Sequence, residues 1–162
     1  MKSRQTKSKS VGEVISIRPA TIDDCDKCAK LLLGQLAEHG VTATEKQLVP
    51  VLQKIVSNET YGFLLLARCG ATPVGVAYAA IILSAEHCGK VVWLEELYVA
   101  PQSRSIGIGA ALLAAVIDQA QALGIVAIDL EIDAGHRRAE SLYRRFGFHS
   151  LNRSRWVKSL RT

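Results

Sequence analysis

A chain of 162 residues, 49% of them hydrophobic, is long enough for one domain with one core, and this composition excludes wholesale disorder. The formal net charge of +5 is uneven: residues 1–10 carry +4, residues 136–162 carry +7 and residues 11–135 carry −6. The basic C-terminal third suits an anionic cofactor, and the acidic middle suits a cationic acceptor. No apolar run approaches the length of a membrane span, and no apolar signal segment follows the basic start, so we expect a cytoplasmic protein without membrane partners.

The sequence predicts a flexible basic tail over residues 1–12 and a single domain over residues 13–162. The tail could touch nucleic acid, but it lacks interleaved aromatic residues. A solvated end is favoured over a nucleic-acid-binding one.

Periodicity and turn signals predict strands and helices along the whole domain. In the first half they indicate a strand, two helices and three strands, at Val14–Ile17, Ile22–Glu38, Glu45–Val56, Tyr61–Cys69, Val74–Leu83 and Val91–Val99. Pro50 is a weak point of the second helix. The second half alternates helix and strand and closes with one or two strands, at Gly107–Leu123, Val126–Ile132, Gly135–Phe146 and Phe148–Leu160. Antiparallel strands followed by β-α-β-α-β indicate an α/β fold, a mixed sheet with helices on both faces.

Two of the four cysteines, Cys25 and Cys28, have the spacing of a redox or zinc pair. No second pair accompanies them, because Cys69 and Cys88 stand apart. Cys25 and Cys28 also fall at helical spacing on the apolar side of the first predicted helix, so plain helix cysteines in a reducing compartment are favoured over a functional pair. We expect no metal site.

The most informative segment runs from Trp93 to Gly109. It reads as an apolar strand with two carboxylates, then an Arg-x-x-Gly-x-Gly turn, then an apolar helix. The first N–H groups of a helix have no partner within it and attract anions, and glycine lets a phosphate approach the backbone. We therefore expect a phosphate-bearing ligand at Arg104–Gly109.

Three kinds of glycine loop compete for this turn. A Walker loop is excluded, because Gly89-Lys90 is followed by valine. The dinucleotide fingerprint lacks its third small residue, since Leu112 stands there, although Asp129 lies at a suitable distance for a ribose contact. The third kind is the pyrophosphate turn of the GNAT N-acetyltransferases, which this turn closely resembles.

A second motif strengthens this resemblance. His136-x-x-Ala139-x-x-Leu142-Tyr143-x-x-x-Gly147-Phe148 resembles the GNAT helix pattern that opens with asparagine, with histidine in the first place. The similarity extends from Val14 to Leu160. It implies a central, mostly antiparallel sheet of six or seven strands, whose fourth and fifth strands splay apart to admit acetyl-CoA as cosubstrate.

The resemblance also implies which residues bind the cofactor. The turn residues would hold the pyrophosphate, and the strand end before them would contact the pantetheine arm through its backbone. These residues are Leu97, Tyr98, Val99, Arg104, Ser105, Ile106, Gly107, Ile108, Gly109 and Ala110. Many family members have glycine in place of Ser105. His136 would contact the cofactor arm in place of the family asparagine.

Acetyl transfer to an amine needs a base, because an alkyl amine with a pKa of about 10 arrives as ammonium at neutral pH. The string Leu-Glu-Glu-Leu-Tyr-Val after Gly89-Lys90 resembles the polyamine branch of the family, which implies Glu95 as the base and Glu96 as a substrate contact. The family's bulge in this strand would disturb the simple alternation of faces. The resemblance makes Tyr143 the general acid. The simpler alternatives are two solvated glutamates and a core tyrosine.

We therefore expect an acetyl-CoA-dependent N-acetyltransferase acting on a primary amine. The acceptor would be a small, polyamine-like amine or a peptide amine, shaped by residues 34–44 and 150–156. The alternative is a CoA-binding regulatory module without robust catalysis. Family members are often dimers, so a homodimer is possible.

Overall fold

The computed structural model describes residues 14–160, which form two compact units, one ending at Glu131 and one beginning at Ile132. The tail predicted for residues 1–12 lies outside the described residues. Within residues 14–160, no helix is long and apolar enough to cross a membrane.

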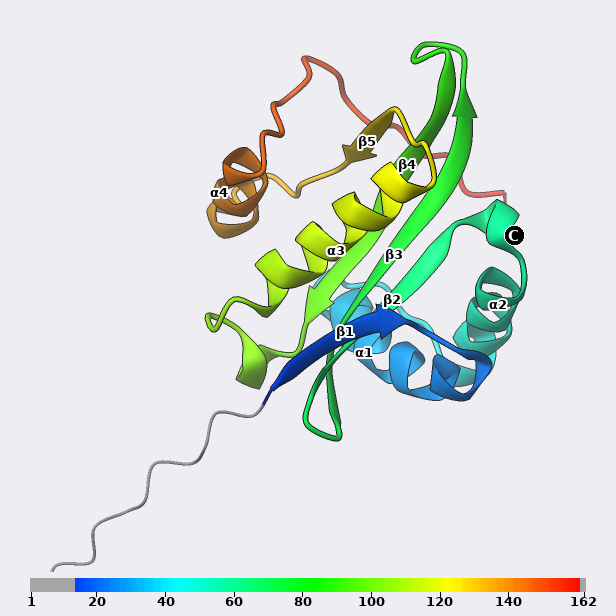
Figure 1. Cartoon of the computed structure of the whole chain (residues 1–162), viewed down its shortest axis with the longest axis vertical. Coiled ribbons are helices and arrows are strands. Elements are labelled where there is room, and N and C mark those ends of the chain that lie inside the picture. The colour runs from blue at the N-terminus through cyan, green and yellow to red at the C-terminus, as the bar shows by residue number, and fades with distance from the viewer. Residues whose placement is uncertain (1–13, 161–162) are drawn as a thin grey trace, which may run out of the picture. The chain divides into compact units, whose positions relative to one another are not determined.

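The first unit is built on a five-stranded sheet whose strands follow one another in chain order (Figure 1). The strands are β1 (Ile15–Pro19), β2 (Phe63–Cys69), β3 (Thr72–Ser84), β4 (Gly89–Val99) and β5 (Ala127–Leu130). Neighbours from β1 to β4 are antiparallel, and β5 joins β4 in parallel. The predicted mixed, mostly antiparallel sheet is confirmed.

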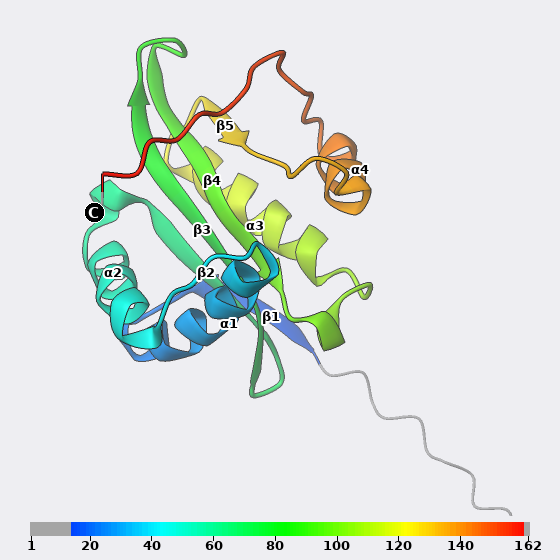
Figure 2. The ribbon, with the colours of Figure 1, turned by 180° about the vertical axis from the view of Figure 1, so that it is seen from behind.

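Helices cover both faces of this sheet, as predicted. α3 (Ile108–Ala122) lies on the near face in Figure 1, and the reverse view shows α1 (Cys25–Glu38) and α2 (Glu45–Ser57) on the other (Figure 2). The core on the α1 and α2 side joins apolar helix residues to alternate strand residues, among them Leu32, Leu52, Leu64, Leu66, Val76 and Tyr98. α2 runs unbroken through Pro50. Its start is fixed by Thr44, whose hydroxyl accepts from the Gln47 N–H at 3.3 Å.

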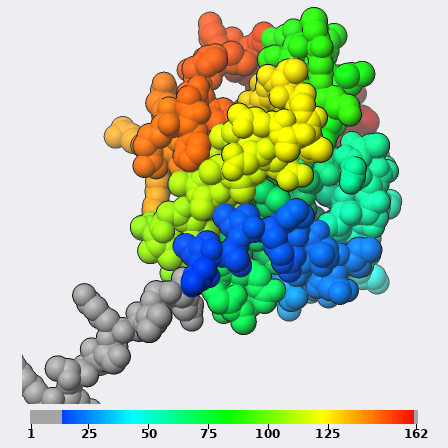
Figure 3. Space-filling view, in the orientation of Figure 1, coloured from blue at the N-terminus to red at the C-terminus, as the bar shows by residue number. Residues whose placement is uncertain are grey.

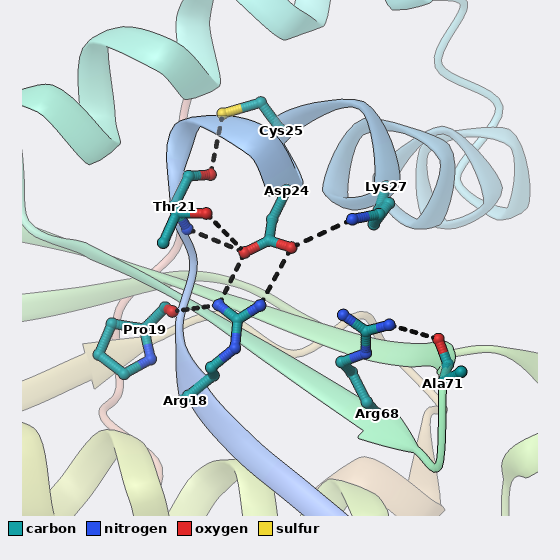
Figure 4. A network of polar contacts seen from close by, with 8 residues as sticks. All are labelled: Arg18, Pro19, Thr21, Asp24, Cys25, Lys27, Arg68 and Ala71. Atoms are coloured by element: carbon teal, nitrogen blue, oxygen red, sulfur yellow. Dashed lines mark hydrogen bonds and ion pairs between the residues drawn. The ribbon is translucent and has the colours of Figure 1, made fainter.

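A buried carboxylate fixes the connection from β1 to α1 (Figure 4). Asp24 is only 2% exposed and accepts two hydrogen bonds from Arg18, at 2.7 and 3.1 Å. It also accepts from the N–H of Thr21 at 3.0 Å and from its hydroxyl at 2.9 Å. Arg18 holds the pKa of Asp24 far below its usual range. The turn of Ile22–Asp24 and the first turn of α1 are therefore held against the sheet edge.

The second unit contains one helix, α4 (Arg137–Arg145). The predicted closing strands in 148–160 and the predicted sheet of six or seven strands are wrong for the described part of the chain, where residues 148–160 form no strand. A strand needs a hydrogen-bonded neighbour and usually a buried face, whereas residues 149–160 are all exposed.

Candidate active site

The two glutamates of β4 lie at a β-bulge. In the pairing of β3 with β4, Ala79 stands opposite Leu94 and Tyr78 stands opposite Glu96, so Glu95 is an extra residue in the ladder. A bulge sets two residues of one strand against one residue of the other. The bulge expected in this strand is present, and it brings both carboxylates to the position facing Tyr78.

The environments of the two carboxylates differ. Glu95 is exposed, whereas Glu96 is half-buried. Burial raises the pKa of Glu96 to about 7, and the neighbouring charge of Glu95 adds to this effect. Glu96 is therefore the acid whose proton occupancy changes near neutral pH.

Tyr78 completes this group on β3. Its hydroxyl donates to the carbonyl oxygen of Tyr61 at 3.0 Å. Burial and the charge of Glu95 both raise the pKa of Tyr78, which places Glu95 close to the phenol. The phenol therefore stays neutral at physiological pH and contributes no third negative charge to the acidic pair.

Beyond these acids, β4 loses its second neighbour. The parallel pairing with β5 ends at Leu94, opposite Leu130, while β4 continues to Val99. Along Leu97, Tyr98 and Val99, the edge of β4 that faces away from β3 therefore has no paired strand in the described sheet. Backbone groups on such an edge can bind an extended ligand.

The turn after β4 has the backbone of an anion site. Ser105 and Gly107 both lie in the left-handed region, with φ of +71° and +92°. Gly107 is the N-cap of α3 and supplies no capping side chain, so the first N–H groups of the helix, at Ile108, Gly109 and Ala110, have no partner within it. A Cβ on Gly107 would meet no atom within 4 Å. α3 lies open on the face drawn in Figure 3, next to β1.

These features fit the diphosphate of CoA. The first turn of α3 contains no acidic residue that would repel it. The acidic pair lies at the start of the strand segment from Glu95 to Val99. The turn of residues 104–110 follows the end of that segment after a short 3-10 helix at Pro101–Ser103, in the same compact unit.

The side chain of Arg104, the first residue of the predicted turn, is bonded to protein groups outside the turn. Its Nε donates to the carbonyl oxygen of Val99 at 2.8 Å, and its Nη2 donates to Oε1 of Glu38 at 2.6 Å. Its guanidinium also lies 5.3 Å from the centre of the Tyr98 ring. The side chain thus contacts α1 and the end of β4.

Tyr143 and His136 belong to the second unit. Tyr143 is buried and packs edge-to-face on Phe148, with ring centres 5.6 Å apart. Burial raises the pKa of Tyr143 to about 12, so its phenol carries a proton at neutral pH. His136 is exposed at the N-terminus of α4.

The other motif residues have local partners. Asp129, the ribose candidate of the dinucleotide alternative, lies opposite Trp93 in the sheet, and its carboxylate is 3.6 Å from His87. Cys25 and Cys28 are buried free cysteines, and burial raises the pKa of the Cys28 thiol to about 12. Buried thiols of this kind are unreactive, which supports the interpretation as plain helix cysteines.

Sequence reasoning missed Glu38 and Gln35 of α1. Gln35 is 8% exposed, and its Oε1 is the one buried side-chain oxygen or nitrogen atom without a hydrogen-bond partner among the described residues. The available signal was a polar residue on the apolar side of the helix, four positions after Leu31. Glu38 gave no such signal, because an acid at a helix end is ordinary.

Comparison with known proteins identifies the family of the chain. A family described as "Acetyltransferase (GNAT) family" matches residues 30–148. A mycothiol acetyltransferase of Pseudarthrobacter chlorophenolicus is 38% identical over 90 residues, which is 54% of this chain. The chain spans about a quarter of that relative's length, 27%.

Solved structures share the fold. An aminoglycoside N-acetyltransferase, AAC(6')-Iy, in complex with CoA has a TM-score of 0.80 and 18% identity, over 94% of this chain and 99% of that one. A predicted acetyltransferase with acetyl-CoA from Clostridium acetobutylicum has a TM-score of 0.75 and 18% identity, over 90% of this chain and 96% of that one. The prediction of a GNAT acetyltransferase fold with acetyl-CoA as the family's cosubstrate is confirmed. The chain belongs to the GNAT family of acetyltransferases.

Proposed function

We propose that this chain transfers the acetyl group of acetyl-CoA to a primary amine. The observation that carries the proposal is the bulge at Glu95, which sets two carboxylates beside an open strand edge that leads to the anion-binding start of α3. Acetyl-CoA would supply the acetyl group as a reactive thioester. The chain's own residues bind the diphosphate, orient the acyl end and move protons.

Glu96 is the proton acceptor in this proposal, and Glu95 attracts the ammonium form of the substrate. The sequence pattern assigned these roles in the opposite order. The half-buried position of Glu96 and its pKa of about 7 support this reversal of the two roles, because a general base works best with a pKa near the working pH. Glu95 is exposed, as suits a residue that meets an incoming cation.

The backbone and Tyr143 supply the remaining steps. The open edge of Leu97–Val99 would orient the pantetheine arm, and a backbone N–H there would polarise the acetyl carbonyl. The N–H groups of Ile108, Gly109 and Ala110 would bind the diphosphate. Tyr143, protonated at neutral pH, would donate its phenolic proton to the sulfur as the thiolate leaves.

The acceptor we propose is a small cationic amine of the polyamine type. Two carboxylates at one position favour a substrate with more than one ammonium group, because the second charge can stay paired while the first amine reacts. The resemblance of Leu94–Val99 to the polyamine branch points the same way. An aminoglycoside, the substrate class in the name of one structural relative, is also a polyamine.

The test is a panel of acceptors assayed by release of free CoA thiol. A linear diamine, a linear triamine, an aminoglycoside and a peptide with a free N-terminus are each compared at saturating acetyl-CoA. We expect the triamine or the diamine to give the highest kcat/KM. Preference for the peptide would contradict the polyamine assignment and leave the transferase intact.

The same panel, combined with a measurement of the melting temperature in acetyl-CoA, separates the transferase from a regulatory module. Acetyl-CoA raises the melting temperature of any native protein that binds it. A rise in the melting temperature without CoA release on any amine would reject catalysis and support a CoA-binding module. The replacement of the family asparagine by His136 is the sequence feature that agrees with such a module. Absence of both signals would reject the cofactor as well.

A further inference from the structure

Glu38 ends α1 and contacts two residues of the predicted cofactor site. Its Oε1 accepts a hydrogen bond from Arg104 Nη2 at 2.6 Å and another from the Tyr98 hydroxyl at 3.3 Å. Tyr98 lies near the end of β4, and Arg104 opens the turn that leads into α3. One carboxylate of α1 is therefore joined to both sides of the bend between strand and turn.

The backbone between these two residues is held as well. Arg104 Nε donates to the carbonyl oxygen of Val99 at 2.8 Å, and the N–H of Ala100 donates to the carbonyl oxygen of Val74 at 2.9 Å. Both polar groups of the Val99–Ala100 peptide thus have partners. The peptide cannot rotate without breaking one of them.

Close packing sets the position of α1 over this bend. A Cβ on Gly34 would lie 2.7 Å from the Tyr98 hydroxyl, so the helix backbone approaches the phenol as closely as glycine allows. The stacking of Arg104 on the Tyr98 ring, 5.3 Å from its centre, adds a cation–π contact to the ion pair. The three side chains form one cluster, which we call the α1 clamp: Glu38, Tyr98 and Arg104.

From this geometry we propose that Glu38 is a positioning residue for acetyl-CoA binding. Glu38 acts through Arg104 and holds the turn of residues 104–110 in its binding conformation before the ligand arrives. The inference rests on the proposed function. It assigns to Arg104 a role in holding the turn rather than in binding phosphate. A carboxylate at 2.6 Å already neutralises the guanidinium, so its attraction for a diphosphate is weakened.

Preordering matters here because the turn is costly to arrange. Ser105 and Gly107 must both adopt the left-handed region, which a free chain rarely combines with a helix start. A turn that is ordered before the ligand arrives loses less entropy on binding. Disruption of the α1 clamp should therefore lower affinity for acetyl-CoA and leave the chemical step little changed.

The sign of one substitution separates the two roles of Arg104. If Arg104 binds phosphate directly, then Glu38 competes with the ligand, and Glu38→Ala frees the guanidinium and tightens binding. If the α1 clamp preorders the turn, then Glu38→Ala weakens binding. Glu38→Gln should restore much of the loss, because an amide oxygen can still accept from Arg104 and Tyr98.

The test measures binding of CoA by calorimetry and the steady-state kinetics of the purified full chain. We expect Glu38→Ala and Arg104→Ala each to raise the Kd for CoA and the KM for acetyl-CoA about fivefold, with kcat within about twofold, the scale of one exposed ion pair. The double variant should lose no more than either single variant. With S-acetylpantetheine, which lacks the diphosphate, the KM should change little. Asp26→Ala, which removes an exposed carboxylate from the same helix, is the matched control.

Amide hydrogen exchange without ligand tests the ordering itself. Glu38→Ala should speed exchange of the Arg104 and Ala111 amides, which donate to the carbonyl oxygens of Pro101 and Gly107 at the two ends of the turn, more than Asp26→Ala does, at unchanged helical content. Tighter binding of CoA by Glu38→Ala, or additive losses in the double variant, would overturn the proposal. Unchanged exchange in the turn would overturn it without any ligand. Failure of the wild-type chain to bind CoA would instead reject the proposed function, with the exchange result still deciding whether the α1 clamp orders the turn.

Discussion

Glu96 stands opposite Tyr78 across β3 and β4, while Glu95, one residue earlier, has no counterpart on β3. Regular pairing would place adjacent glutamates on opposite faces of the sheet. At the bulge this alternation is interrupted, and the two glutamates stand together opposite Tyr78. Glu96 is the less exposed of the two, and burial, with the charge of Glu95 added, raises its pKa to about 7.

This arrangement predicts different pH profiles for two variants. Glu96→Gln should lower kcat/KM by about 10²-fold or more near pH 7 and much less above pH 9, because free amine in solution bypasses the base. In the wild type, kcat/KM should rise through a pKa of about 7, as Glu96 loses its proton. Glu95→Gln should mainly raise the KM for the amine. Steady-state rates from pH 6 to 10 provide the measurement.

The reverse outcome has a clear meaning. A pH-dependent loss in Glu95→Gln with a near-normal profile in Glu96→Gln would restore the roles that the sequence pattern suggested. An equal loss across the pH range in both variants would show that the pair positions substrate and accepts no proton.

Stability should also depend on Glu96. A carboxyl group with a raised pKa stabilises the folded state below its unfolded value near 4.5, and this contribution is lost as pH rises through the folded value of about 7. Glu96→Gln should therefore be more stable than the wild type at pH 8, by on the order of 1 kcal/mol, and nearly equal to it at pH 4.5. Urea unfolding at the two pH values measures the difference. A variant less stable at pH 8 would contradict the raised pKa.

Gly107→Val tests the anion site. The added side chain meets no protein atom, but it occupies the space in front of the helix N-terminus and strains a φ of +92°. We expect the variant to lose most of the rise in melting temperature that acetyl-CoA gives the wild type. Gly124→Val is a matched control, since its φ is +68° and its Cβ position is also open, at the other end of α3. A ligand shift retained by Gly107→Val would remove the turn from the cofactor site.

Much of the fold could be predicted because its signals are local. The start of α2 at Glu45 and the end of α3 before Gly124 follow from capping residues and helical periodicity. The strands from Phe63 to Val99 follow from apolar runs divided by turn residues. The closing strands were mispredicted because a run such as Trp156–Val157 has strand propensity, whereas a strand also requires a neighbouring edge.

Only the part of the site that lies within sequence motifs could be predicted. Ser105 in the left-handed region agrees with the family's frequent glycine there, and the backbone of the turn follows from the glycine spacing. The partners of Arg104 could not be predicted, because Glu38 is 66 residues away along the chain and meets it only once α1 has packed on β4. The difference between Glu95 and Glu96 likewise depends on burial, which the bulge determines.

The Arg18–Asp24 pair should control acid stability. Asp24 is buried with a lowered pKa, so its contribution is present above the unfolded value near 3.8 and is lost as pH falls through the folded value. Arg18→Leu leaves this carboxylate without its main partner and should cost about 2–4 kcal/mol at pH 7 in urea unfolding. Lys27→Ala removes a longer contact of 3.4 Å and should cost about 0.5 kcal/mol. Equal costs for the two variants would show that the buried geometry contributes nothing.

Tyr143→Phe removes the phenol and keeps the ring that packs on Phe148, so the melting temperature should change little. A phenol with a pKa of about 12 is protonated at every pH at which the amine reacts, and it is needed only as the sulfur leaves. The variant should therefore lose kcat by about 10²-fold, while the Kd for CoA stays within about twofold. A weakened Kd with kcat intact would make Tyr143 a packing residue. Unchanged kinetics would reject the acid role, since a thiolate of pKa about 8.5 can leave without a donor when solvent is near.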